Sequence, residues 1–148
     1  MFSGEELLNF MKQATWAVFN DYESELIQSY TGLSLEELAK MVEALIITRG
    51  GKGSDIYTKG GCIQIPPATA KAVLDPTGCG DAYRSGLLYG LMNSYSWEET
   101  GRIASLMGAI KIEHHGTQNH TFTMEEFKIR YHENFGTSLW ALLTRKSY

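Results

Sequence analysis

The sequence predicts an α/β fold in which helices pack on a sheet. Two observations predict it: the helix-start pattern Ser/Thr-x-x-Glu occurs four times, and short apolar runs lie between the expected helices. The resulting order is helix, strand, helices, strand, hairpin and then three helices. Helices interleaved with apolar strands in this way are typical of layered α/β domains.

The expected helices begin at recognisable caps. In a capping box, a Ser or Thr and a Glu three positions later each satisfy a free amide of the first turn. The boxes are Ser3–Glu6, Ser34–Glu37, Ser96–Glu99 and Thr123–Glu126, and they predict helices over 4–14, 35–42, 97–115 and 124–134. We expect a fifth helix over 21–30, after Asn20, and a sixth that begins near Gly80 or Asp81.

The expected strands are short and few. WAVFN (16–20) and ALIIT (44–48) have the composition of buried parallel strands. SDIYTK and CIQIP predict a hairpin joined across Gly60-Gly61. Two central strands cannot cover the apolar faces of six helices, so we expect further strands from a larger domain or from a second chain.

Composition narrows the class of protein. The chain has 148 residues, which suits one domain, and its net charge of −4 argues against a nucleic-acid surface. No apolar stretch is long enough to span a bilayer, so no membrane role is expected. Cys62 and Cys79 are far apart and form no Cys-x-x-Cys motif, which favours a reducing, cytoplasmic setting.

The segment TGCGD (77–81) is the clearest candidate site. Gly78 and Gly80 can adopt backbone angles that let successive amides form an anion nest at a helix start. Asp81 would repel a phosphate, so it fits better as a base that takes the proton of a substrate hydroxyl. From these residues alone, an ordinary glycine turn followed by a first-turn acid is the favoured explanation of the pattern.

The longer segment DPTGCGDAYRSGLL (75–88) resembles the signature of the PfkB/ribokinase family of carbohydrate and nucleoside kinases. The resemblance implies a three-layer αβα ribokinase-like fold, present in part, with residues 1–148 as the C-terminal nucleotide-binding half of a kinase domain. It also implies that Asp81 is the catalytic base and that the amides of Gly78, Cys79 and Gly80 form the anion hole. Cys79 departs from the usual Ala or Gly, and within the family the segment looks closest to bacterial adenosine-kinase-like members.

Two further segments resemble motifs of the family. NDYE matches its Asn-x-x-Glu motif as Asn20 and Glu23, which implies that they organise phosphate and Mg²⁺, with Glu23 acting through water. The simpler alternative is a helix cap that Glu23 completes. TRGGKGS resembles the stretch that lies along ATP, as Thr48, Gly50 and Gly53, and from the residues alone it equally suits a glycine loop entering a hairpin.

The resemblance extends to the segment 104–120. It implies that Ala104 and Gly108 line the adenine side, although small residues there also suit helix packing. In several family members a monovalent cation such as K⁺ binds near the anion hole. The corresponding positions are Asp75, Thr77, Lys111, His114, Gly116 and His120, of which His120 replaces an oxygen donor.

The function implied by the resemblance is an ATP- and Mg²⁺-dependent phosphotransferase acting on an alcohol group of a sugar or nucleoside. Because the family's N-terminal half supplies most substrate contacts, we expect little kinase activity from this chain alone. The alternative is a non-catalytic remnant that binds nucleotide or forms a homo-oligomer through an exposed sheet edge.

Overall fold

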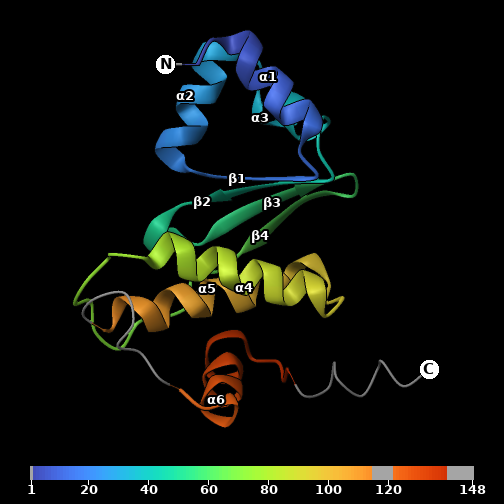
Figure 1. Ribbon diagram of the computed structural model, residues 1–148. Helices are drawn as coiled ribbons and strands as arrows, with labels where there is room; N and C mark the ends of the chain where they lie inside the picture. Colours follow the sequence, from blue (N-terminus) through green and yellow to red (C-terminus); the bar gives the residue numbers. More distant parts are fainter. Residues whose placement is uncertain (1, 115–121, 140–148) are drawn as a thin grey trace. The chain divides into compact units, whose positions relative to one another are not determined.

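The computed structural model describes residues 2–114 and 122–139. The chain divides into two compact units, Met1–Ile65 and Pro66–Tyr148, each of which is described by itself. The first unit contains α1 (Gly4–Gln13), β1 (Trp16–Asn20), α2 (Asp21–Thr31), α3 (Leu35–Ala39), β2 (Ala44–Thr48), the short 3₁₀ helix η1 (Gly50–Lys52), β3 (Ser54–Thr58) and β4 (Gly61–Ile65). The second contains α4 (Cys79–Met92), α5 (Trp97–Ile112) and α6 (Met124–Phe135) (Figure 1).

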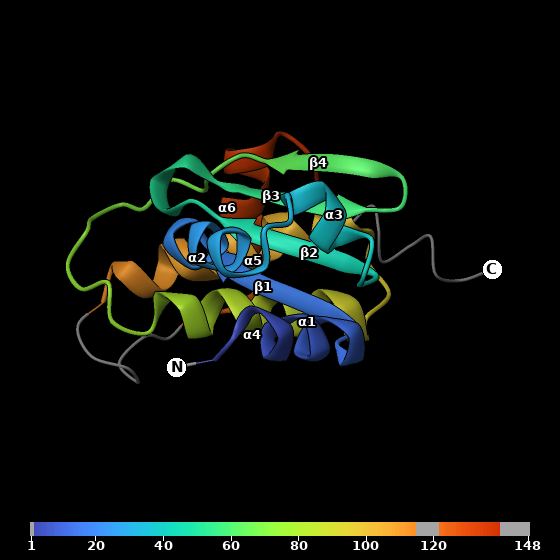
Figure 2. The same cartoon turned by 90° about the horizontal axis from the view of Figure 1, so that it is seen from above.

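The first unit is built on a mixed four-stranded sheet with the order β1-β2-β3-β4 (Figure 2). β1 and β2 are parallel, and β3 pairs antiparallel with both β2 and β4. The predicted α/β class, the parallel strands and the hairpin are therefore confirmed. The position expected for the hairpin loop, Gly60-Gly61, is wrong by one residue. Gly61 pairs with Thr58 and begins β4, with a φ of 116°.

Helices α1, α2 and α3 cover one face of this sheet (Figure 1). Alternate residues of a strand point to the same face, so Leu45 and Ile47 of β2 enter the same core. The buried members of that core are Met11, Ala17, Ile27, Leu38, Val42, Leu45 and Ile47. α3 is shorter than predicted, because the chain turns after Ala39 and Val42 donates back to its carbonyl at 3.3 Å.

Most of the predicted caps form. Complete capping boxes begin α1, α5 and α6, as expected, and α2 begins with a complete box as well. At α3 the Ser34 hydroxyl accepts from the Glu37 amide, but the Glu37 carboxylate accepts from that hydroxyl rather than from the Ser34 amide. Capping thus explains where five of the six α-helices of the described chain begin.

In the second unit, two glycines let α4 and α5 pack closely. A Cβ added at Gly86 would lie 2.6 Å from the Cα of Ala104, and one at Gly90 would lie 2.5 Å from the Thr100 hydroxyl oxygen. A separate core joins α5 to α6 around Ile103, Leu106 and Tyr131. No helix in the described ranges is both long and apolar enough to cross a membrane.

Candidate functional site

The start of α4 lacks a side-chain cap. Gly78 occupies the N-cap position in the left-handed region, with φ 79° and ψ 4°. The Cys79 amide donates to the Pro76 carbonyl at 3.2 Å, and the first intrahelical bond is that from Ala82 to Gly78. Within residues 2–114 and 122–139, the Gly80 and Asp81 amides have no hydrogen-bond acceptor. Open amides at the positive end of a helix dipole are suited to bind an anion.

Asp81 lies in the first turn of α4 and points into solvent, with 89% of its side chain exposed. It forms an ion pair with Arg84, whose Nη1 lies 3.5 Å from Asp81 Oδ1. An exposed ion pair of this kind is weak and readily exchanged. The carboxylate is therefore accessible to a substrate group.

Cys79 is half-buried beside two charged residues. Burial raises the pKa of its thiol, and Asp75 raises it further, while the charge of the buried Lys111 acts in the opposite direction. Gly108 of α5 faces the same turn, since a Cβ added there would lie 3.8 Å from the Cys79 carbonyl oxygen. The thiol consequently stays protonated at neutral pH.

The residues that precede Gly78 form a tight turn. The Thr77 amide donates to Asp75 Oδ1 at 2.9 Å, and the Asp75 amide donates to the Ile112 carbonyl at 3.2 Å. Of the other positions assigned to a monovalent cation, Gly116 and His120 lie outside the described residues. The described part of the chain contains no group of three or more His, Cys, Asp or Glu residues arranged to hold a metal.

Ala104 is fully buried in α5 at the close approach to Gly86. Helix packing is therefore sufficient to explain why residue 104 is small. Its assignment to the adenine side stays a prediction.

In the first unit, the other two motifs lie at the ends of neighbouring strands. Asn20 ends β1, Thr48 ends β2, and the two residues are register partners in the parallel pair. Ligand sites in α/β folds commonly form at the carboxyl ends of parallel strands. Asn20 also caps α2: its Oδ1 accepts from the Glu23 amide at 2.7 Å, and Glu23 Oε2 accepts from the Asn20 amide at 2.9 Å. The capping alternative is therefore present, and the Mg²⁺ role stays a prediction.

The loop after Thr48 closes on itself. Gly50 and Gly53 have φ values of 54° and 90°, which other residues rarely adopt. The Arg49 amide donates to the Gly53 carbonyl at 2.8 Å, and the Gly53 amide donates to Gly50 at 3.3 Å. The two predicted glycine positions are thus required by the backbone, whatever they bind.

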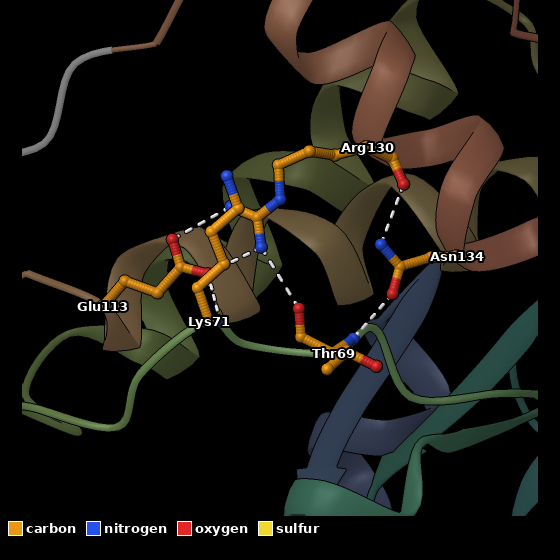
Figure 3. A network of polar contacts seen from close by, with 5 residues as sticks. All are labelled: Thr69, Lys71, Glu113, Arg130 and Asn134. Carbon is orange, nitrogen blue, oxygen red and sulfur yellow. Dashed lines mark hydrogen bonds and ion pairs between the residues drawn. The ribbon is translucent and has the colours of Figure 1, made fainter.

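A polar network in the second unit was missed by the sequence analysis (Figure 3). Arg130 of α6 and Glu113, just past α5, form two hydrogen bonds of 2.9 and 2.6 Å, and their side chains are only 12% and 10% exposed. Both residues, with Asn134, also bind the backbone around Thr69 and Lys71. These partners are separated by 17 to 65 residues in sequence, so no local pattern indicates them.

A cavity of about 380 Å³ lies between the end of α5 and α6. Glu113, Arg130 and Lys71 are among the residues that line it, whereas Cys79 and Asp81 are not. The cavity is therefore separate from the loop at the start of α4.

The chain belongs to the pfkB family of carbohydrate kinases, whose profile it matches over residues 3–124. A nucleoside kinase from Methanocaldococcus jannaschii is 34% identical over 125 residues, which cover 84% of this chain and 41% of the relative. A ribokinase from Lactococcus lactis is 32% identical over 120 residues, covering 78% and 40%. These matches confirm the resemblance inferred from the sequence.

Solved structures give the same result. The structure of Burkholderia thailandensis nucleoside kinase in complex with inosine is 47% identical, with a TM-score of 0.89 over 93% of this chain and 45% of that one. The same enzyme is also known in complex with ADP-inosine. The fold is therefore ribokinase-like and partial, and the chain spans less than half of each of these relatives.

Proposed function

We propose that the chain is the nucleotide-binding half of a kinase domain that transfers the γ-phosphoryl group of ATP to an alcohol group of a nucleoside. The observation that carries this proposal is the start of α4, where a left-handed Gly78 leaves first-turn amides open next to an exposed Asp81. Membership of the pfkB family supports the same reading. The alternative acceptor is an alcohol group of a sugar.

Each residue of the loop has a chemical role in this proposal. The acceptor hydroxyl attacks the γ-phosphorus, the bond from that phosphorus to the bridging oxygen breaks, and ADP leaves with that oxygen. The proton of the hydroxyl passes to the Asp81 carboxylate. The amides of Gly78, Cys79 and Gly80 would stabilise the negative charge on the transferring group, and the Cys79 amide would do so in place of its bond to the Pro76 carbonyl.

The family resemblance assigns the remaining nucleotide contacts. Thr48, Gly50 and Gly53 would lie along the ATP, and Ala104 and Gly108 would line its adenine side. Mg²⁺ would offset the phosphate charge, and Glu23 fits a role through water because only its Oε2 is used by the cap. Asp75, Thr77 and Gly116 are the positions proposed for a monovalent cation.

A nucleoside is favoured over a sugar because nucleoside kinases recur among the relatives. The Methanocaldococcus jannaschii relative is a nucleoside kinase, and two Burkholderia thailandensis structures contain inosine or ADP-inosine. The adenosine-kinase-like character inferred from the sequence belongs to the same class of acceptor.

We further propose that the sheet of the working enzyme continues beyond β1, an edge strand in this unit. The Thr15 carbonyl accepts from the Glu43 amide at 2.8 Å and therefore points toward β2. Because backbone groups alternate in direction along a strand, those of Ala17 and Phe19 also point toward β2, whereas those of Val18 point outward. The relatives, with more than twice the aligned length, have further chain that can supply the next strand. The alternative occupant is a second copy of this chain.

A chimaera that joins the amino-terminal half of the Burkholderia thailandensis kinase to this chain tests the proposal. We expect it to phosphorylate nucleosides far faster than sugars, and we expect the 148-residue chain alone to bind MgADP but turn over little. An inactive but folded chimaera, together with no MgADP binding, would contradict the kinase function. Light scattering reports the alternative, since a dimer abolished by Val18→Pro would favour the oligomerising module.

A further inference from the structure

The segment that leads into the α4 loop has almost no structure of its own. Residues 66–75, here called the strap, form neither helix nor strand. Pro66 and Pro67 begin it and have no amide hydrogen to donate. The strap ends at Asp75, which is three residues before Gly78. Its conformation therefore depends on groups supplied by the rest of the second unit.

Those groups come from α5, from its end and from α6. The Ser105 hydroxyl accepts from the Ala68 amide at 3.0 Å, and Asn134 Oδ1 accepts from the Thr69 amide at 2.7 Å. Arg130 Nη2 donates to the Thr69 carbonyl at 3.1 Å. Each contact joins the strap to a residue at least 37 positions away in sequence.

Glu113 connects the strap to Arg130 of α6. Its Oε1 accepts from the Lys71 amide at 2.7 Å and from Arg130 at 2.6 Å (Figure 3). The preceding residue, Ile112, accepts from the Leu74 amide at 2.9 Å and from the Asp75 amide at 3.2 Å. Two consecutive residues at the end of α5 thus fix the strap at both its middle and its end.

The charge of Glu113 is maintained at neutral pH. Burial acts to raise the pKa of this carboxyl, but hydrogen bonds from Arg130 and Lys71 outweigh it, so the pKa is lowered from its ordinary value. The stabilisation is therefore complete above the unfolded-state pKa and is lost as the pH falls through the lowered one.

We propose that Glu113, Arg130 and Asn134 are positioning residues that hold the strap and thereby set the conformation of the Gly78–Asp81 loop. The effect on nucleotide binding rests on the proposed function, whereas the effect on the strap does not. Because the Glu113–Arg130 pair is bidentate and nearly buried, its planar geometry fixes direction as well as distance.

The experiment compares Glu113→Gln with Glu98→Gln in the full chain. Both changes remove a carboxylate that pairs with an arginine, since Glu98 accepts from Arg102 at 2.8 Å, but Glu98 makes no bond to the strap in the described chain. We expect Glu113→Gln to speed hydrogen exchange at the Thr69 and Lys71 amides at least about tenfold and to weaken MgADP binding. Glu98→Gln should leave both unchanged, and Arg130→Lys should be intermediate.

Two outcomes would overturn the proposal. In the first, the strap amides of Glu113→Gln exchange as in the parent chain. In the second, exchange rises equally throughout α5 and α6, which would mean that the pair stabilises the unit without a specific effect on the strap. If the parent chain does not bind MgADP, the proposed function fails, and the exchange comparison still decides whether the strap is held by this network.

Discussion

The first turns of α2 and α4 both have free backbone amides, and the two helices use them in opposite ways. At α2, Asn20 and Glu23 exchange hydrogen bonds of 2.7 and 2.9 Å and thereby occupy free amides. At α4, Gly78 supplies no side chain, and the Gly80 and Asp81 amides stay open within the described chain. A helix start can be stabilised by its own side chains or kept available for an external anion, and the other described α-helices follow α2.

The largest effect should follow from replacing Asp81 in the first turn of α4. In the chimaera, Asp81→Asn should lower kcat by about 10²–10⁴, because the amide cannot accept the proton of the hydroxyl. MgADP affinity should change little. Steady-state kinetics measure both, with Asp21→Asn in the first turn of α2 as the control. A kcat within about threefold of the parent value would rule out Asp81 as the base.

The next largest effect concerns how α4 is held without a cap. Gly86→Ala should lower the free energy of unfolding by about 1–3 kcal/mol, because the new Cβ meets the Cα of Ala104 at 2.6 Å. Gly108→Ala is the matched control, since its nearest contact would be 3.8 Å away. Urea denaturation should find the control at least as stable as the parent. Equal stability of both variants would show that the close approach is not required.

The role of Gly78 in the backbone conformation can be separated from its proposed role in anion binding. Gly78 and Gly136 both have positive φ, 79° and 69°, so alanine at either should cost about 1–2 kcal/mol of stability. Only Gly78→Ala should also weaken MgADP binding, which calorimetry can measure. The same loss of affinity in Gly136→Ala would mean that destabilisation alone explains the result.

The smallest expected effect comes from removing the cap of α2. Asn20→Ala should lower stability by about 0.5–2 kcal/mol, and Ser3→Ala, which removes the equivalent cap of α1, should cost a similar amount. If Asn20 also organises phosphate and Mg²⁺, its variant alone should weaken MgATP binding. Unchanged MgATP affinity would leave Asn20 with a capping role only.

The predictable parts of the structure are those encoded over a few residues. A cap needs Ser3 and Glu6 only three positions apart, and a buried strand such as 44–48 is a continuous apolar run, so both could be identified from the sequence. The contact between Gly86 and Ala104 could not be identified, because it depends on how two helices cross. The same holds for Asn134 and Thr69, which are 65 residues apart.

The candidate site also has one part that could be predicted from the sequence and one part that could not. The Gly78–Asp81 loop could be predicted because glycine freedom and a helix start are local properties. That the Thr48–Gly53 loop would use its amides internally, whereas the α4 loop would leave the Gly80 and Asp81 amides open, depends on backbone angles that the residue types only permit. Motif matching found both loops but could not show which of them keeps open amides.

The half-buried thiol of Cys79 has one more consequence for the α4 loop. A cysteine at the first position of a helix is often ionised, because the helix dipole favours thiolate. Here burial raises the thiol pKa and outweighs the opposing charge of Lys111, and Asp75 also favours the neutral form. An uncharged sulfur adds no electrostatic repulsion toward a polyanionic ligand, so the loop can contain a cysteine where an alanine or glycine would serve.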